Sequence, residues 1–189
     1  MTDPSRRQVL QAGGVVSGCG MVGCLTSPGR RTGGGCSGGG RWAIRFRSIG
    51  HGSHEGFRLV ADPEMVAFGD DITFCLRNVS EESLHVGTDG NYTIQKRHDD
   101  DWRNVFSTEA GMGWDGSAQR VDPNEVAFTW TFTVTETGFV DARYELCNPL
   151  TVGEYRFVYW ALPDRPPKAT QGDSDSTHHA VARRFTIQE

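Results

Sequence analysis

Histidine side chains are common metal ligands, and two pairs of them stand out in this chain of 189 residues. His51 and His54 flank Gly52-Ser53 in a polar turn, and His178-His179 lie in a hydrophilic stretch before the last apolar segment. Neither pair has the helical spacing or the cysteine partners of a zinc site. We therefore expect solvated loop histidines, with no bound metal and no cofactor.

Other reactive groups do not form a recognisable catalytic set. The run Asp99-Asp100-Asp101 lacks the alternating oxygen ligands and the glycine of a calcium loop, so we expect a hydrated hairpin tip. The sequence contains no cysteine–histidine pairing in a known catalytic setting, and no glycine-rich phosphate loop before a helix. These observations predict a protein that is not an enzyme.

Copper binding is the most specific alternative to a protein without a metal. The segment Tyr144 to Pro149 places Cys147 two residues before a proline, which resembles the ligand loop of blue-copper sandwiches. Such a site needs a thiolate, two imidazoles and a weak axial ligand. Leu150 and Glu154 stand where the second histidine and the axial methionine belong, and His85 alone does not complete a site. A cupredoxin-like electron carrier is kept as an alternative function whose ligands are missing.

The N-terminus indicates export. Arg6-Arg7 precede a short apolar run that ends in two cysteines within small-residue settings, Cys19 and Cys24. Paired arginines before a modest apolar run are typical of a removable signal for the folded-export route. The run is too polar and glycine-rich to supply the roughly 20 apolar residues of a spanning helix. We predict a twin-arginine lipoprotein signal over residues 1–25, with lipidation of Cys24 or, alternatively, of Cys19.

A linker and one domain follow the signal. Residues 26–41 read TSPGRRTGGGCSGGGR and should form a flexible coil, and residues 42–189 have a length that suits a single core. The net charge of −5 argues against nucleic acid as a partner. Lysine occurs only at Lys96 and Lys168, which fits a haloarchaeal-type lipoprotein but also any GC-rich genome. We expect an extracytoplasmic protein held by a lipid anchor on the outer face of the cytoplasmic membrane.

Apolar residues in this domain recur with a period of two residues. Apolar side chains alternate with others in six segments, and turn residues such as Gly69-Asp70-Asp71 and Asp122-Pro123-Asn124 separate them. The expected strands cover residues 57–61, 72–77, 92–96, 128–134, 155–159 and 180–187. Such spacing predicts an all-β fold, an antiparallel β-sandwich of about seven strands. Within it, Leu150-x-x-Gly153-x-Tyr155 is the kind of segment that builds a tyrosine corner.

The order of these segments resembles the bacterial immunoglobulin-like (Big-type) domains. The shared features are the tyrosine-x-isoleucine-x-lysine run at Tyr92, Trp102 after an acidic turn, Val121-Asp122-Pro123-Asn124-Glu125, and Gly153-Glu154-Tyr155-Arg156 near the end. The match covers about Phe57 to Leu162 and departs at Val152, where the family usually has proline, and at 136–148, which is longer than usual. The resemblance implies an immunoglobulin-like sandwich that is mostly non-catalytic and diverse in its partners.

Further expectations concern single residues of this domain. Cys75 and Cys147 are candidates for a disulfide in an oxidising compartment, although the alternation of their strand turns Cys75 away from Phe74 and Leu76. Two sequons, at Asn78 and Asn91, lie at strand ends where a glycan would point outward.

A binding role fits these features best. Trp114 lies in a glycine-rich loop and is a candidate contact with a partner, which would be a protein or a surface polymer. Loops 111–120 and 163–179 form the expected contact surface. We predict a membrane-tethered binding or structural module without catalysis. A secreted proteinase inhibitor that uses the proline-rich segment 162–168 is the alternative.

Overall fold

The structure is a computed structural model that describes residues 45–106, 116–163 and 177–189. All of them belong to one unit of the chain, Gly33–Glu189. Within these ranges every regular element is a strand, and no helix is present that is long and apolar enough to cross a membrane.

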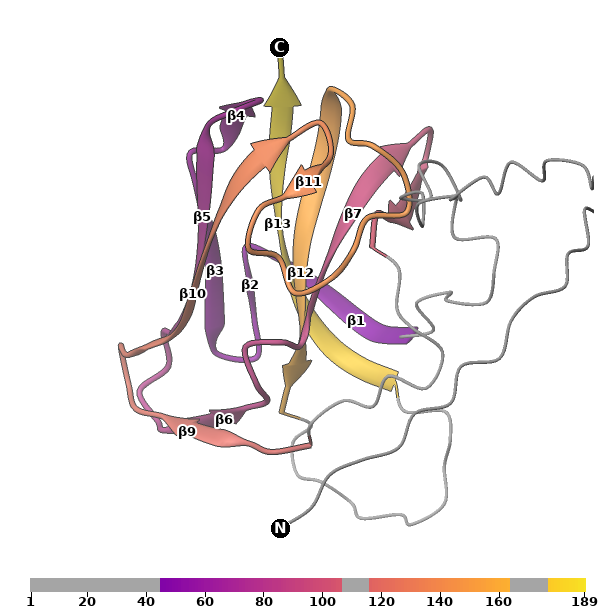
Figure 1. The fold of residues 1–189 in the computed structure, drawn as a ribbon. Coiled ribbons are helices and arrows are strands. Elements are labelled where there is room, and N and C mark those ends of the chain that lie inside the picture. Colours follow the sequence, from indigo (N-terminus) through magenta and orange to yellow (C-terminus); the bar gives the residue numbers. More distant parts are fainter. Residues whose placement is uncertain (1–44, 107–115, 164–176) are drawn as a thin grey trace, which may run out of the picture. The chain divides into compact units, whose positions relative to one another are not determined.

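Two large sheets contain most of the strands (Figure 1). Sheet I has the order β1-β13-β12-β7-β8, with β4 beside the C-terminal end of β13, and sheet II has the order β11-β10-β5-β3-β2. A separate pair consists of β6 and β9. The bounds of the strands are β1 Arg45–His51, β2 Ser53–His54, β3 Phe57–Asp62, β4 Met65–Ala67, β5 Asp71–Asn78, β6 Leu84–Val86, β7 Tyr92–His98, β8 Asp101–Asn104, β9 Gln119–Val121, β10 Val126–Thr135, β11 Gly138–Phe139, β12 Gly153–Leu162 and β13 Thr177–Gln188.

The predicted all-β sandwich is confirmed. The six predicted strands correspond to β3, β5, β7, β10, β12 and β13, and the remaining strands are short or lie before residue 57. In β3, Phe57 and Leu59 are buried while Arg58 and Val60 are exposed, as the period of two requires. Two pairings are parallel rather than antiparallel, because both β1 and β4 run alongside β13 in its own direction.

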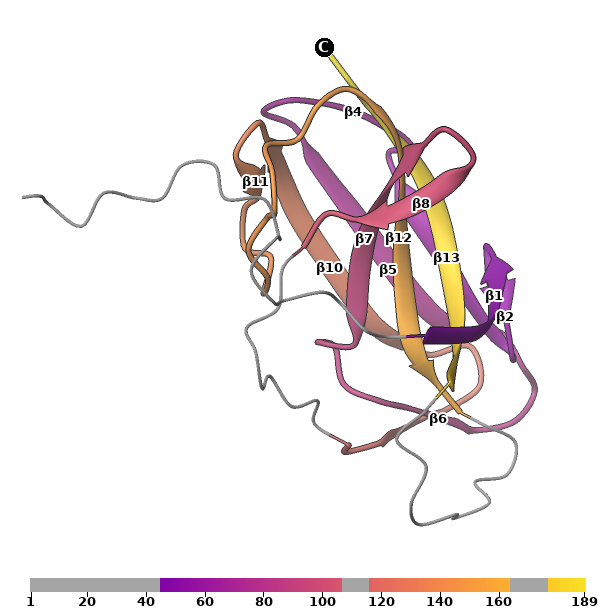
Figure 2. The same ribbon diagram turned by 90° about the vertical axis from the view of Figure 1, so that its right-hand side faces the viewer.

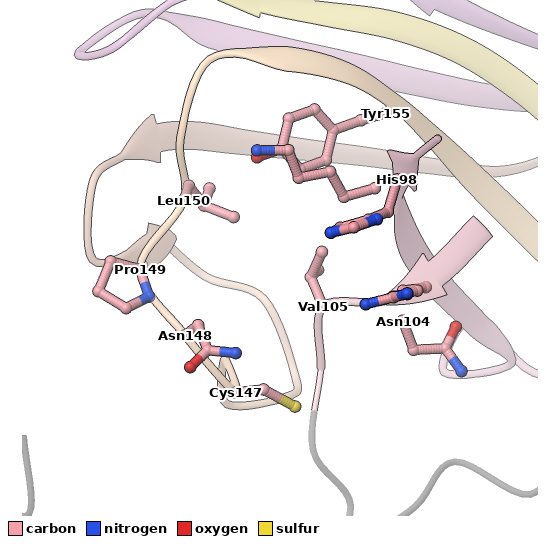
Figure 3. Close-up of a pocket in the computed structure, with 10 residues that line it drawn as sticks. His98, Asn104, Val105, Cys147, Asn148, Pro149, Leu150 and Tyr155 are labelled. Atoms are coloured by element: carbon pink, nitrogen blue, oxygen red, sulfur yellow. The ribbon is translucent and has the colours of Figure 1, made fainter. Parts of the chain in front are cut away.

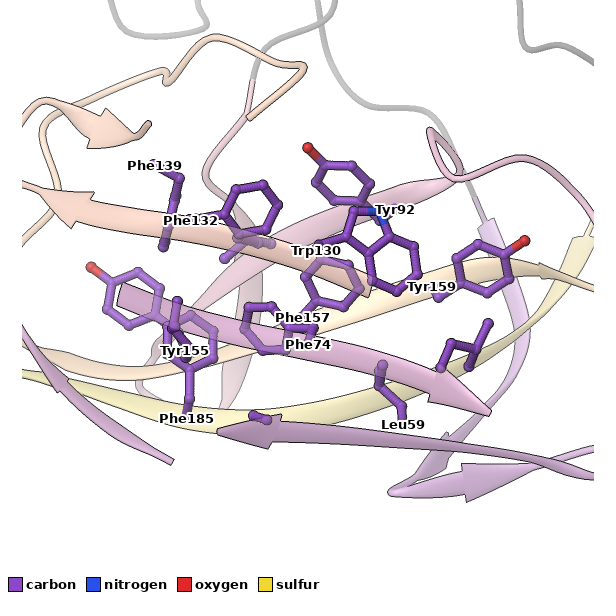
Figure 4. Close-up of a cluster of buried hydrophobic side chains, with 14 of the residues drawn as sticks. Leu59, Phe74, Tyr92, Trp130, Phe132, Phe139, Tyr155, Phe157, Tyr159 and Phe185 are labelled. Carbon is purple, nitrogen blue, oxygen red and sulfur yellow. The ribbon is translucent and has the colours of Figure 1, made fainter. Parts of the chain in front are cut away.

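Aromatic side chains from both sheets fill the space between them (Figure 4). Phe74 of sheet II stacks on Phe157 of sheet I with ring centroids 4.3 Å apart, and Tyr92 stacks on the same ring at 5.1 Å. Trp130, from the predicted strand 128–134, is 8% exposed and also contacts Phe157. Since each such aromatic pair contributes about 0.5–1.5 kcal/mol beyond area burial, this cluster fixes how the two sheets face each other.

The predicted tyrosine corner is confirmed at the start of β12. The Tyr155 hydroxyl donates to the Thr151 carbonyl oxygen at 2.6 Å and accepts from the Thr151 amide at 3.2 Å. The corner fixes the loop that precedes β12. It thereby sets which side chains of β12 face the core and which face outward from sheet I.

The outer face of sheet I is divided into two parts. At one end, Phe46 and Ile49 of β1 pack on Val158, Trp160 and the small residues of β13, so that this end is covered by apolar contacts. Figure 2 shows this sheet from outside, with β8, β7, β12 and β13 side by side and β1 beside one end of β13. Beyond β1 the face carries polar and charged side chains, which form the candidate site.

Candidate functional site

Strand register places a row of polar side chains across the outer face of sheet I. Gln95 of β7 lies opposite Arg156 of β12, and Arg156 lies opposite Arg184 of β13. Two residues further along β7, on the same face, Arg97 lies opposite Trp102 of β8. These side chains face outward because Tyr155 and Phe157, the neighbours of Arg156 in the chain, face the core. We call Gln95, Arg97, Trp102, Arg156 and Arg184 the arginine platform.

Arg156 is the central member of the arginine platform and is only 8% exposed. Its Nε donates to the Gln95 side-chain oxygen at 2.7 Å, and Gln95 in turn donates to the Asn104 side-chain oxygen at 2.8 Å. No carboxylate of the described residues pairs with Arg156. The guanidinium is therefore held at one nitrogen, while its remaining N–H groups have no acidic partner.

Trp102 provides the aromatic part of the platform. The Cζ atom of Arg156 lies 4.5 Å from the centre of the Trp102 ring, and those of Arg97 and Arg184 both lie 5.7 Å from it. Guanidinium groups bind favourably to an indole face, and the contact fixes their orientation. One half-buried ring thus gathers three positive charges.

One carboxylate partly balances these charges. Glu154 lies 3.2 Å from Arg184 and 3.9 Å from Arg97, so it serves the two outer arginines. Arg97 also approaches Asp100 at the hairpin tip, at 3.8 Å. Burial, together with the charge of Arg184, lowers the pKa of Arg156 to about 10, which leaves it cationic at neutral pH.

A hollow adjoins the arginine platform on the β13 side. It has a volume of about 370 Å³ and is lined by His51, Gly52, Glu64, Ala182, Arg183 and Arg184. Burial lowers the pKa of His51, and the charges of Arg184 and Arg156 lower it further. Glu64 also lines this hollow and pairs with Arg183, so a carboxylate partly balances its positive charges.

A second cavity lies on the other side of the β7–β8 hairpin (Figure 3). Its volume is about 210 Å³, and its walls are formed by β7, β8, the segment 147–150 and the ring of Tyr155. Lys96, His98 and Arg103 are its ionisable lining residues apart from Tyr155. Lys96 lies opposite Arg103 in the register of the hairpin, so one face of the hairpin lines the cavity and the other carries Arg97 and Trp102.

This arrangement is suited to binding anions. Guanidinium groups bind carboxylate, sulfate or phosphate through paired hydrogen bonds, and they do so most strongly where water is excluded. Cationic groups on both faces of the β7–β8 hairpin extend the surface beyond one small anion. The nearby acidic residues, Glu154 and those at the hairpin tip, limit the positive potential to the platform and the two cavities.

Several predicted site residues lie outside the described residues. These are Arg6 and Arg7 of the signal, the lipidation candidates Cys19 and Cys24, and Trp114. Residues 111–115 of the first expected contact loop and 164–176 of the second lie outside as well, and with them most of the segment of the inhibitor alternative. These predictions remain predictions.

The predicted pairing of Cys75 with Cys147 is wrong. Cys75 is a free thiol, and Cys147 is disulfide-bonded to a different cysteine. Cys75 lies on the outer face of sheet II, opposite Val60, whereas Cys147 lines the cavity beside β7 and β8 of sheet I. The two sheets with their core therefore separate these cysteines. The disulfide also removes the thiolate that a copper site would need.

The prediction that both sequons point outward is wrong too. Asn78 has no exposed surface, and its amide nitrogen donates to the carbonyl oxygens of Glu82 and Val121 at 2.8 and 3.0 Å. Asn91 is 2% exposed and its side-chain oxygen accepts from the amide and hydroxyl of Thr88. Both side chains tie loops to the sandwich, so neither presents its nitrogen for glycosylation.

The histidines differ from their predicted state, whereas the acidic run does not. His54 and His179 belong to β2 and β13, are half-buried and contact each other, so they are not solvated loop residues. His178 packs on Trp160 with ring centroids 4.9 Å apart. Residues 99–101 form the exposed tip of the β7–β8 hairpin, as predicted.

Sequence reasoning missed the arginine platform. Its members come from four strands, and only their register brings them into one row. One usable signal was present: Arg156 stands between two core aromatics in a period-two strand, and must therefore face outward beside whatever lies on the neighbouring strands.

Comparisons with known proteins give no family for this chain. No family model matches it, and no curated protein matches it. Among solved structures, it is similar to a β-glucosidase of Erythrobacter marinus with 17% identity and a TM-score of 0.33, over 70% of this chain and 15% of that one. It is also similar to a mutant β-glucosidase of Listeria innocua in complex with laminaribiose, with 15% identity and a TM-score of 0.28, over 81% of this chain and 20% of that one. The chain thus spans a small part of those proteins, and likenesses this weak assign it no activity.

Proposed function

We propose that this chain is an exported, lipid-anchored, non-catalytic binding module whose sandwich binds an anionic polysaccharide at the cell surface. The observation that carries the binding role is Arg156, a buried guanidinium with no acidic partner among the described residues, stacked on Trp102. Natural proteins rarely bury an arginine without a carboxylate. An anion from a ligand would provide the missing partner.

An extended polyanion fits the site better than a small ion. The cationic groups continue from the arginine platform to the cavity lined by Lys96 and Arg103, whereas the hollow at His51 also holds Glu64, which pairs with Arg183. A sugar acid or sugar sulfate supplies charges for the arginines and an apolar ring face for Trp102. The net charge of −5 opposes long-range attraction of any polyanion, nucleic acid or polysaccharide, so binding has to rest on short-range contacts with the arginine platform.

The order of strands supports an immunoglobulin-like domain. Sheet II contains β3-β5-β10, which corresponds to A-B-E of an immunoglobulin sandwich, and sheet I contains β8-β7-β12-β13, which corresponds to C′-C-F-G. Domains of this kind are widely used as binding modules on cell surfaces, and their site has to be argued from its residues.

Export and anchoring rest on the sequence of residues 1–41 alone. A twin-arginine signal with a lipidated cysteine and a flexible linker would hold the domain close to the outer face of the cytoplasmic membrane, where surface polysaccharides are accessible. Substitution of both Arg6 and Arg7 by lysine should block export. Cys24→Ala should release the chain from the membrane fraction, whereas Cys19→Ala should not; the opposite result would assign the lipid to Cys19.

Affinity electrophoresis of the full chain tests the binding role. Native gels containing polygalacturonate, a polymer of carboxylates, or dextran sulfate should retard the protein in a salt-dependent manner, and gels containing neutral dextran should not. Arg156→Met and Arg184→Gln should abolish most of the retardation.

Arg58→Gln is the matched control, because Arg58 is an exposed arginine on the outer face of sheet II and its loss changes the net charge equally. Equal loss of retardation in this control would show that only net charge matters and would contradict the proposal. Tighter binding to a single-stranded oligonucleotide than to either polysaccharide would contradict the choice of ligand.

A further inference from the structure

A second cluster of polar side chains lies at the covered end of sheet I, away from the arginine platform in the register of the strands. It consists of Ser48 of β1, His54 of β2, Glu55 in the turn after β2, and His179 of β13. The parallel pairing of β1 with β13 places Ser48 directly opposite His179, and the β1–β2 turn returns His54 to the same point. Residues 125 positions apart in the chain thus meet.

Each of the two imidazoles directs one ring nitrogen toward the same point. His54 Nε2 and His179 Nδ1 are 3.4 Å apart, and the Ser48 hydroxyl oxygen lies 2.8 Å from the first and 2.7 Å from the second. Glu55 brings a carboxylate oxygen to 3.9 Å from His54 Nε2. The ligand atoms of the two histidines and Glu55 all lie within 4.8 Å of one another.

The separation of 3.4 Å between the two imidazole nitrogens matches one edge of a metal coordination shell, and the Glu55 oxygen at 3.9 Å would move closer to complete it. With zinc–nitrogen distances of about 2.0–2.1 Å, two ligands of a tetrahedral ion lie about 3.3–3.4 Å apart. Two imidazoles and one carboxylate are also a donor set that binds Zn²⁺ while leaving a position for water. We propose that His54, His179 and Glu55 form a binding site for a divalent transition-metal ion such as Zn²⁺, with Ser48 beside it.

The geometry favours a metal site over a serine–histidine catalytic unit. In a catalytic triad the carboxylate binds the ring nitrogen opposite to the one that contacts the serine. Here Glu55 and Ser48 both approach Nε2 of His54, so the carboxylate does not orient the imidazole for proton transfer. Instead, Glu55, Ser48 and His179 all approach Nε2 of His54, as ligands around a common centre do.

The backbone is shaped to hold this cluster. A methyl group at Gly50 would lie 2.5 Å from His54 Cβ and 2.4 Å from the Ser53 carbonyl oxygen, so only glycine allows the turn to fold back this closely. Glu55 has a φ of 47°, an uncommon conformation for a residue with a side chain. The side chains of His54 and Glu55 are 23% and 35% exposed, which leaves the cluster open to an entering ion.

Calorimetric titration of the full, tag-free chain with Zn²⁺ after chelator treatment tests the proposal. One ion per chain should bind to the wild type. His54→Gln and His179→Gln should each weaken this binding by at least the roughly 10- to 100-fold that even the loss of outer-shell groups causes. His98→Gln, which changes an exposed histidine of the β7–β8 hairpin, should leave it unchanged.

A measurement on the wild type covers the case in which a variant does not fold. In a histidine-detected NMR titration, Zn²⁺ should shift the ring signals of His54 and His179 together, with saturation at one equivalent, while His98 stays in place. No binding to the wild type, binding that survives both substitutions, or shifts confined to other histidines would each overturn the proposal. The results for His54→Gln and His179→Gln are independent of the polysaccharide test, because neither residue belongs to the arginine platform or lines either cavity.

Discussion

Replacing Arg156 by methionine separates the contribution of this guanidinium to ligand binding from its contribution to stability. Methionine keeps an unbranched apolar stem of similar length, so the packing beside Trp102 is largely retained. The charge and the hydrogen bond to Gln95 are lost. If Arg156 serves the ligand rather than the fold, binding should fall strongly while stability stays nearly the same.

The magnitude follows from the burial of the charge. Burial and the charge of Arg184 lower the pKa of Arg156 to about 10, well below its usual value, which corresponds to about 3 kcal/mol of unfavourable free energy at neutral pH. Against this stand the contact with Trp102, at about 0.5–2 kcal/mol, and a charged hydrogen bond to Gln95, at about 1.5–3 kcal/mol. Because these contributions largely offset each other, we expect the substitution to change the free energy of unfolding by between a gain of about 1 kcal/mol and a loss of about 2 kcal/mol.

Urea denaturation followed by tryptophan fluorescence measures this difference directly, provided that the slope against urea concentration is unchanged. An arginine that completes a buried ion pair behaves differently, since breaking such a pair costs about 3–5 kcal/mol. A loss above about 2 kcal/mol in Arg156→Met would therefore refute the view that this guanidinium lacks an acidic partner within the protein. Retained binding to polygalacturonate in a stable variant would refute its role in binding.

Three further predictions use the same physical reasoning. Burial raises the pKa of all four tyrosines, that of Tyr92 to about 12, so absorbance at 295 nm should show no phenol ionising near pH 10 in the folded protein. Stability from the Tyr92 phenol is complete below pH 10 and is lost as the pH rises through about 12; ionisation of this phenol near pH 10 in the folded protein would contradict this. Arg184→Gln should raise the pKa of His51 in an NMR titration, because one of the charges that lower it is removed, and an unchanged value would show that burial alone acts. Asn78→Ala should lower the free energy of unfolding by about 2 kcal/mol in urea, because buried carbonyl oxygens lose their donor, and a loss below about 0.5 kcal/mol would contradict the structural role of this amide.

The sequence was sufficient to predict the class of fold. Alternation in a segment such as Phe57 to Ala61 depends only on neighbours in the chain, and it shows directly which side chains enter the core. The tyrosine corner was equally accessible, since Tyr155 and Thr151 lie within one short turn. Local patterns of this kind do not specify which strands are neighbours, and the short strands β1, β2 and β4 carry too few residues to show a period.

The sites were not predicted, because both depend on pairing between distant strands. His54 and His179 meet only because β1 runs parallel to β13, a pairing that no local pattern indicates. The same reason explains the incorrect disulfide: alternation showed that Cys75 faces away from its own core, but not that Cys147 belongs to the other sheet. Both sequons were misjudged because a strand end can be covered by a loop that its own asparagine anchors.

The placement of the arginine platform on strands, rather than on loops, has a consequence for binding. Arg156 is fixed by Gln95 and Trp102 before any ligand arrives, and Glu154 restrains Arg97 and Arg184. A site whose side chains are already ordered loses little conformational entropy on binding, so modest contacts suffice for affinity. The same rigidity fixes the spacing of the three guanidiniums, and this spacing can discriminate between polymers whose charges repeat at different intervals. Selectivity among polyanions should therefore depend on charge spacing more than on total charge. A platform of mobile loop arginines would show the reverse.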